Sequence, residues 1–199
     1  MSLTATPYGL RPVKRVDGLP YAGAVREFEI NPAGIAQNLF NGSIVSLDTN
    51  GYIVMTPTAG GDGAAGALLA IGVAVGFEFV NSMGQPTFSQ YYPAAYVAPA
   101  GTKIKVKVVD DPDVLFQGQL DGPALQAMIG ANTFLAAVQS TSTGNPRTGN
   151  STSALESTVV ATAAGFRVIE IVSPLTDAFG DVLVKFNPGQ HVYLNAAGI

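Results

Sequence analysis

The chain has 199 residues, of which 12% are charged, and its formal net charge at pH 7 is -4. A single domain of this length buries roughly 70% of the surface that its unfolded chain exposes, so it can form a core without covalent staples. The chain has one histidine, no cysteine and no tryptophan, which argues against metal clusters and thiol catalysis. Its net negative charge argues against binding to nucleic acid, which needs a basic surface.

The low charge and a mean hydropathy of +0.30 leave much of the surface uncharged, which suggests that a partner covers some of it. The lack of cysteine fits folding in a reducing cytoplasm. The most apolar run, residues 64–77, has only 14 residues and contains three glycines, so it is too short to span a bilayer and is expected to be a buried strand.

Residues 1–26 are expected to form an extended N-terminal docking arm, and residues 27–199 a β-rich body. The first 26 residues carry four basic residues and one acidic residue, a net +3, which leaves six basic and thirteen acidic residues, a net -7, in the body. Pro7, Pro12 and Pro20 interrupt regular pairing and keep this part of the chain extended. A disordered tail, or a first strand folded back on its own body, is the alternative.

The expected arm contains both charged and apolar contact residues. Its cations would pair with acidic groups of a partner and its apolar side chains would provide anchors. The residues expected to dock are Tyr8, Leu10, Arg11, Lys14, Arg15 and Tyr21. If the arm is independent of the body, deleting residues 2–20 leaves the melting temperature of the free protein nearly unchanged.

The body shows short segments with a two-residue period. Because successive side chains of a strand point to opposite faces, the three lysines of KIKVKVV (103–109) share one face and the apolar residues share the other. In residues 71–80, five large residues, Ile71, Val73, Val75, Phe77 and Phe79, should likewise share one face. Strands are expected at 25–30, 43–47, 52–56, 71–80, 87–92, 103–109, 166–172, 182–186 and 191–195.

Turn and loop signals separate these strands. Asn50 and Gly51 tolerate the positive φ of a tight hairpin turn, a short helix is expected at 122–130, and residues 58–67 and 139–158 have the composition of exposed loops. Strands at such regular spacing predict an all-β protein, an antiparallel β-sandwich or barrel with an extended N-terminal arm.

Three patterns resemble active-site or metal-site motifs. The glycines of 61–66 match G-x-G-x-x-G, but no helix follows to direct its amides at phosphate, so a loop is expected. Asp110, Asp111 and Asp113 could offer oxygens to a hard cation, although the same residues are common in a turn with solvated carboxylates. His191 could act with a serine and Asp177 in a hydrolase, but without a nucleophile motif a partly buried structural histidine at a strand start is favoured. We therefore expect no enzymatic activity, no catalytic residue, no metal and no cofactor.

Aromatic residues gather at Phe88, Tyr91, Tyr92 and Tyr96. Tyrosine combines apolar area with a polar tip, so these rings could stack on sugars or fill a protein interface. We assign Tyr91, Tyr92 and Tyr96 to an oligomer or surface contact. Core packing is the alternative.

Three stretches carry a family resemblance: TPYGLRPVKRVDGLPYAGAVREFEI (6–30), NGSIVSLDTNGYIVMT (41–56) and AIGVAVGFEFVNSMGQPTFSQYYPA (70–94), with a looser likeness at FNPGQHVY (186–193). Over about half of the chain, this order of segments resembles the decoration, or cement, proteins of tailed-bacteriophage heads. The resemblance implies an all-β virion protein that binds as a symmetric oligomer to the outside of a shell of HK97-type major capsid proteins and reinforces it.

The expected function is therefore structural: decoration and stabilisation of an icosahedral phage head. The protein would be assembled in the host cytoplasm and located on the capsid surface, as a trimer or dimer, without nucleic acid or membrane as partner. A virion-surface carbohydrate-binding or host-adhesion module is the alternative, and it would use the tyrosines and the loop at 139–158.

Overall fold

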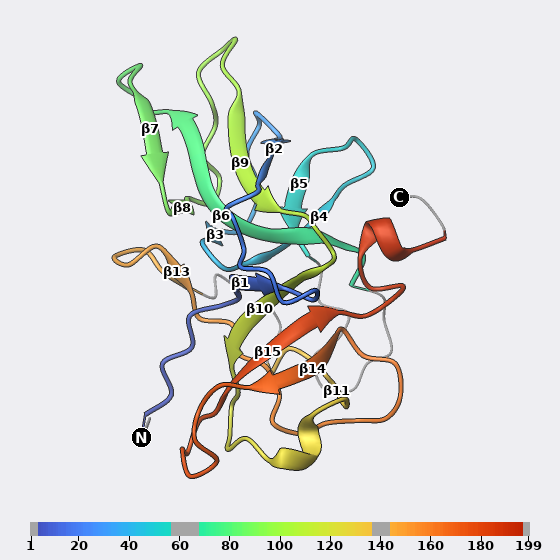
Figure 1. The fold of residues 1–199 in the computed structure, drawn as a ribbon. Helices are drawn as coiled ribbons and strands as arrows, with labels where there is room; N and C mark the ends of the chain where they lie inside the picture. The colour runs from blue at the N-terminus through green and yellow to red at the C-terminus, as the bar shows by residue number, and fades with distance from the viewer. Residues whose placement is uncertain (1–3, 57–67, 137–143, 197–199) are drawn as a thin grey trace.

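The computed structural model describes residues 4–56, 68–136 and 144–196, and the regular structure of this part of the chain is almost entirely β-strand (Figure 1). The strands are β1 (Arg11–Arg15), β2 (Arg26–Ile30), β3 (Leu39–Phe40), β4 (Ile44–Leu47), β5 (Ile53–Met55), β6 (Ala70–Val80), β7 (Pro86–Ser89), β8 (Tyr91–Tyr92), β9 (Ile104–Val109), β10 (Val114–Gln119), β11 (Asn132–Thr133), β12 (Gly144–Asn145), β13 (Asn150–Ser151), β14 (Phe166–Ile171) and β15 (Asp181–Phe186). Two 3-10 turns, η1 (Gln126–Met128) and η2 (Val192–Leu194), complete the regular structure of these residues.

Five of the strands close into a barrel. Strands β4, β5, β2, β9 and β6 are hydrogen-bonded in that order, β4 also pairs with β6, and β7 adds to the outer side of β6. Every pairing in this sheet is antiparallel except β2 with β5. The expected all-β, antiparallel fold with a barrel is confirmed.

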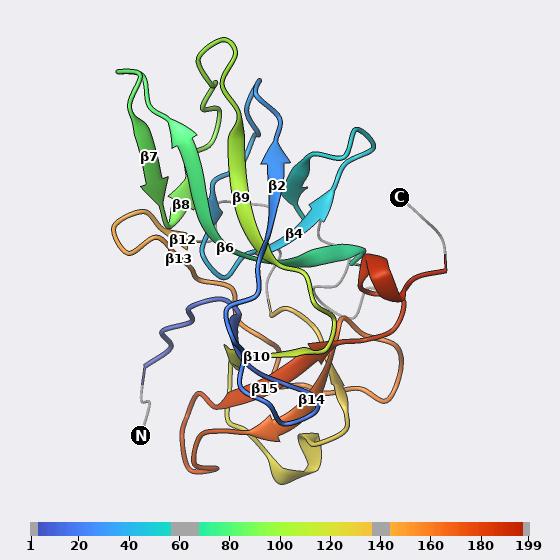
Figure 2. The ribbon, with the colours of Figure 1, turned by 45° about the horizontal axis from the view of Figure 1, so that its top comes forward.

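A second sheet lies below the barrel in the view of Figure 1, with the strand order β1-β10-β15-β14-β11. The short stretch from Asp110 to Asp113 joins β9 of the barrel directly to β10 of this sheet, and the rotated view in Figure 2 shows this connection between the two halves. The expected docking arm also belongs here, because β1 is paired antiparallel with β10.

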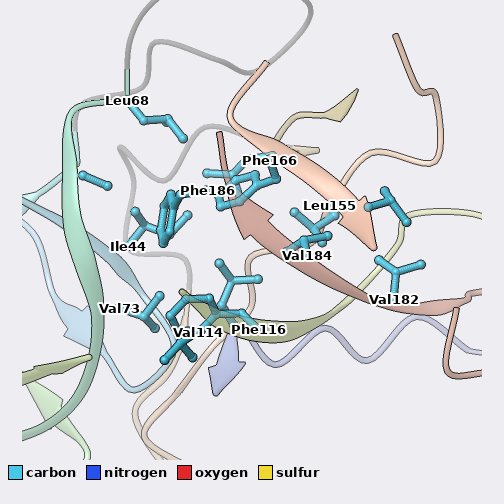
Figure 3. Packing of buried hydrophobic residues seen from close by; sticks show 14 of the residues in the cluster. Ile44, Leu68, Val73, Val114, Phe116, Leu155, Phe166, Val182, Val184 and Phe186 are labelled. Atoms are coloured by element: carbon cyan, nitrogen blue, oxygen red, sulfur yellow. The ribbon is translucent and has the colours of Figure 1, made fainter. Parts of the chain in front are cut away.

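Two apolar clusters hold these sheets together. One fills the barrel and includes Ile30, Tyr92 and Val106. The other lies between the barrel and the five-stranded sheet, where Ile44 and Val73 face rings such as Phe186 (Figure 3). The ring of Phe186 lies 5.7 Å from that of Phe116 and 5.0 Å from that of Phe166, so three strands meet around one aromatic group.

Strand β9 confirms the alternation read from its sequence. Ile104, Val106 and Val108 have no exposed surface, while the lysines face outward. Lys105 forms an ion pair with Glu27 at 3.1 Å, and Lys103 forms one with Glu29.

Strand β6 corrects the expectation that its large residues share one face. The register with β4 shifts near Gly72 and the register with β9 shifts at Val75, and each β-bulge reverses the alternation. Ile71 and Phe77 therefore face the barrel interior, while Val73 belongs to the cluster between the two sheets.

Other segments also differ from their expected structure. Residues 191–195 do not form a strand, because the chain turns into η2 after His191, and the helix expected at 122–130 is reduced to η1. The segment 87–92 breaks at Gln90 into β7 and β8, which pair with different strands. The glycine pattern at 61–66 and the loop at 58–67 lie outside the described residues, and the described part of 139–158 contains the β12–β13 hairpin.

The extended N-terminal arm is not confirmed. Its residues are fixed to the body by β1, which is the alternative of a first strand folded back, and β2 begins at Arg26, the last residue of the expected arm. Pro12 does not prevent this pairing, because β1 is an edge strand of its sheet. A proline on an edge strand removes no hydrogen bond between strands in the sheet interior.

Candidate functional site

We use "N-terminal segment" for residues 4–25, the described chain before β2. Its first part is anchored to the body. Leu10 is 2% exposed and belongs to the cluster between the sheets, and its N–H donates to the carbonyl of Gly42 at 3.0 Å. The hydroxyl of Tyr8 donates to Asp181 at 2.8 Å, and burial, followed by this bond, raises the pKa of Tyr8. Tyr8 and Leu10 are therefore anchors of the chain's own fold.

The segment then doubles back on β1. The N–H of Arg15 donates to the carbonyl of Leu19 at 2.8 Å, and the N–H of Tyr21 donates to the carbonyl of Val13 at 3.2 Å. A carboxylate oxygen of Asp17 accepts from the N–H of Leu19 at 3.1 Å, which fixes the turn. This small hairpin presents residues 13–20 at the molecular surface.

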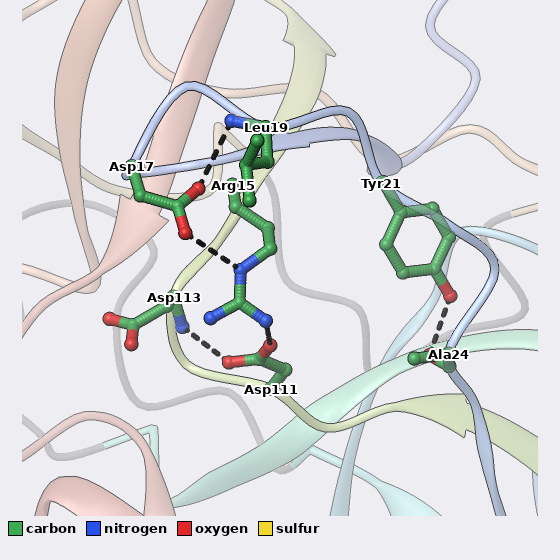
Figure 4. Close-up of polar contacts among 7 residues, drawn as sticks. All are labelled: Arg15, Asp17, Leu19, Tyr21, Ala24, Asp111 and Asp113. Carbon is green, nitrogen blue, oxygen red and sulfur yellow. Dashed lines mark hydrogen bonds and ion pairs between the residues drawn. The ribbon is translucent and has the colours of Figure 1, made fainter.

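Ion pairs attach this hairpin to the body (Figure 4). The guanidinium of Arg15 lies 2.9 Å from Asp111 and 3.4 Å from Asp17, and Asp111 also accepts from the N–H of Asp113 at 2.9 Å. Lys14 pairs with Glu170 of β14. Two of the cations expected to bind a partner are therefore bound to carboxylates of their own chain, whereas Arg11 lies 4.4 Å from the centre of the Tyr8 ring.

A second polar cluster closes the end of the N-terminal segment. Arg26 lies 3.2 Å from Asp110 and donates to the hydroxyl of Tyr193 at 2.9 Å, and that hydroxyl donates to Asp110 at 2.9 Å. Asp110 is only 8% exposed, and a buried carboxylate needs a positively charged partner close by. The guanidinium of Arg26 is that partner. A hollow of about 420 Å³ opens beside these residues.

The aspartates at 110–113 do not converge on a cation. Asp110 and Asp111 are directed to Arg26 and Arg15, and in residues 4–56, 68–136 and 144–196 no group of three metal-binding side chains is found. Asp113 is exposed on the turn between β9 and β10. Asp110 also departs from the alternative of a solvated carboxylate, because it is buried.

His191 is fully buried rather than placed in an open pocket. Its Nδ1 accepts from the N–H of Tyr193 at 3.2 Å, and its ring centre lies 5.3 Å from those of Phe186 and Tyr193. Burial lowers the pKa of His191 below its ordinary value. With Nδ1 occupied as the cap of η2 and no exposed surface, this ring has a structural position.

The tyrosines divide between core and margin. Tyr92 has no exposed surface and donates to the carbonyl of Tyr96 at 2.7 Å, and burial raises the pKa of Tyr92 to about 12. Its assignment as a surface contact was wrong, because the ring packs inside the barrel cluster. Tyr96 is half-buried against Phe79, and Tyr91 is half-buried and stacks on Phe40 with 5.8 Å between ring centres.

The surface also exposes apolar residues, and of these only Phe88 belongs to the aromatic residues that the sequence singled out. Four of them, Val13, Val16, Leu19 and Val25, belong to the N-terminal segment and are between 41% and 60% exposed. Met83 and Phe88, at the β6–β7 hairpin, are 82% and 72% exposed. In a loop no period distinguishes an exposed valine from a buried one, so the sequence could not reveal the exposed valines. In the second region, the aromatic residues grouped with Phe88 were the signal.

Comparison of the chain with protein-family models, with curated proteins and with solved structures finds no match. In the described chain there is also no helix of the length and hydropathy that a membrane span requires.

Proposed function

We propose that this protein is a structural virion component that decorates and stabilises the outside of an icosahedral phage head. It binds the shell of HK97-type major capsid proteins, and the N-terminal segment supplies the docking surface. The observation that carries the proposal is the exposure of Val13, Val16, Leu19 and Val25 within one short stretch of an acidic, weakly charged protein. Exposed apolar side chains gathered in this way are typical of a surface that a partner covers.

The way in which the segment is held supports this role. Hydrogen bonds across the 15–19 turn and the ion pair of Arg15 with Asp111 fix the backbone before binding. A surface that is already ordered loses less conformational entropy when a partner binds it. Docking therefore uses a rigid, fixed hairpin in place of the free arm that the sequence suggested.

Many copies on one shell let modest contacts reinforce the particle together, because neighbouring contacts raise the effective concentration of each docking site. The carbohydrate-binding alternative depended on a platform of tyrosines. Tyr92 is inside the barrel, and one face of Tyr91 stacks on Phe40, so the three tyrosines do not form one shared platform for a sugar.

Co-sedimentation with undecorated, expanded shells tests the proposal. Val16→Asp and Leu19→Asp each place a charge on the docking surface, and each should weaken binding roughly tenfold or more, the effect of removing an interface anchor. Leu175→Asp is the matched control, because Leu175 is 49% exposed in the loop between β14 and β15, and it should bind as the wild type does. Wild-type binding by both hairpin variants would show that another surface docks, and wild-type protein that ignores shells but binds on a glycan array would favour the adhesion alternative.

A further inference from the structure

The free edge of β7 is a different surface from the docking hairpin. Strand β7 pairs with β6 alone, while the next strand, β8, leaves the sheet to pair with β3. In Figures 1 and 2, β7 lies at the outer margin of the barrel half. Because the barrel strands satisfy each other in a closed ring, this added strand leaves a row of main-chain groups without a neighbouring strand in the described chain.

The register determines which groups face outward. The N–H of Asn81 donates to the carbonyl of Gln85 at 2.9 Å, and residues two positions apart in an antiparallel pair repeat this pattern. Thr87 and Ser89, opposite Phe79 and Phe77, therefore direct their main-chain groups to β6. The N–H and C=O of Phe88 are directed away from β6 and are available to another strand.

This edge has only part of the usual protection against pairing with an identical strand. Natural edge strands are very short or carry proline, lysine, inward-pointing charges or bulges, and β7 has only the short length and the proline. Residues 79–102 contain no charged residue, and β7 pairs with β6 without a register shift. Pro86, at the first position of β7, removes one outward donor but leaves Phe88 free.

We propose that β7 pairs antiparallel with β7 of a second copy of this chain about a two-fold axis through Phe88. With the axis through Phe88, Phe88 meets Phe88 of the second copy and Thr87 meets Ser89, so the paired strands oppose no like charges. The charged side chain beside this edge, Arg147, would meet the uncharged turn 81–85 of the second copy. The Phe88 side chains of the two copies would form a cross-strand aromatic pair.

The Phe88 ring has space to shift toward β6 when a second ring packs against it from the free edge. A hollow of about 290 Å³ beside Phe88 is lined by Gly76, Glu78 and Lys107, and a Cβ added at Gly76 would meet no atom within 4 Å. A contact made by four residues of each chain is small, so the pair should dissociate on dilution. This self-association does not depend on binding to a shell.

Sedimentation of the full chain over a concentration series tests the pairing. Wild-type protein should shift from a 20.4 kDa species to a dimer as its concentration rises. Phe88→Lys and Phe88→Glu should each remain monomeric, because each opposes a charge with the same charge. An equimolar mixture of these two variants should restore dimers, a result that loss of folding could not produce. Leu175→Lys, in the exposed loop between β14 and β15 of the other sheet, is the matched control and should dimerise normally.

Three results would overturn the proposal. They are wild-type protein that stays monomeric throughout the series, a Phe88→Lys variant that dimerises as well as the wild type, and a wild-type trimer that the substitution leaves intact. If the wild type is monomeric in solution and Phe88→Lys loses shell binding, a strand of the shell rather than a second copy occupies the edge. Val16→Asp and Leu19→Asp should dimerise normally, so a failure of shell docking remains distinguishable from a failure of strand pairing.

Discussion

Gly72 occupies the point where β6 changes the face that its side chains present. Its φ of +155° lies at the limit of the range in which residues with a side chain are strained, and a Cβ there would lie 2.1 Å from the carbonyl oxygen of Val109. Backbone atoms on β9 cannot move away without disturbing the barrel. Gly76, four residues later on the same strand, has open space where its Cβ would be.

Gly72→Ala should therefore lower the free energy of unfolding by about 2–4 kcal/mol, through overpacking and backbone strain. Gly76→Ala, the control in the same strand, should change it by less than about 0.5 kcal/mol. Urea denaturation of the three proteins measures both effects. Equal stability of the two variants would contradict the close approach of β6 and β9 at Gly72.

At the scale of the secondary structure elements, β1 is part of the fold as well as the support of the docking hairpin. It covers the edge of β10, and the residue before it, Leu10, inserts into the cluster between the sheets. Deleting residues 2–20 would uncover that edge and leave a cavity. The structure thus predicts a lower melting temperature for the truncated protein, contrary to the expectation for an independent arm.

Leu10→Ala isolates the contribution of this anchor. It should reduce the free energy of unfolding by about 2–5 kcal/mol, the usual range for a buried leucine. Leu19→Ala, at a residue that is 60% exposed on the same segment, should alter it by less than about 0.5 kcal/mol. Chemical denaturation measures the free energy of unfolding of both variants. If Leu10→Ala is as stable as Leu19→Ala, Leu10 does not anchor the N-terminal segment to the body.

At the scale of the whole molecule, the C-terminal segment joins the barrel to the five-stranded sheet. The N–H of Ala70 on β6 donates to the carbonyl of Gln190 at 3.0 Å, and the next residue, His191, packs on Phe186 of β15. The histidine is therefore buried where the two halves meet. Its protonation state affects the stability of the entire fold.

The pH dependence follows from the lowered pKa of His191. In the unfolded chain the imidazole takes up a proton near its ordinary pKa of 6.5, whereas burial keeps the folded protein from doing so until lower pH, although Asp110 and Asp111 oppose this shift. This contribution to stability is present above pH 6.5 and is lost as the pH falls from 6.5 through the folded pKa. The free energy of unfolding, measured by urea denaturation over this window, should decrease.

His191→Asn provides the comparison, because asparagine can still accept the capping hydrogen bond of η2 but does not titrate. The variant should show a shallower decrease in stability below pH 6.5 than the wild type. The same slope in both proteins would mean that other groups, and not His191, produce the pH dependence.

The sequence by itself determined the all-β class and the position of its most regular strands. Alternation in β9 and the Asn50–Gly51 turn are local properties, because side-chain direction and turn conformation depend on neighbouring residues. The lack of a catalytic motif around His191 predicted a structural histidine that is partly buried at a strand start, whereas the ring is fully buried and caps η2.

Only the tertiary structure decided which strands pair, which aromatic residues are core and which surface remains for a partner. The two bulges of β6 lie in its pairings with β4 and β9. Arg15 and Asp111 form their ion pair although 96 residues separate them in the sequence. Neither feature depends on neighbouring residues, so no local pattern could reveal it. The same reason explains the N-terminal segment. Its prolines and cations predicted an extended arm, but the open edge of β10 and the carboxylates beside it lie on distant parts of the chain, and they hold the segment against its own body.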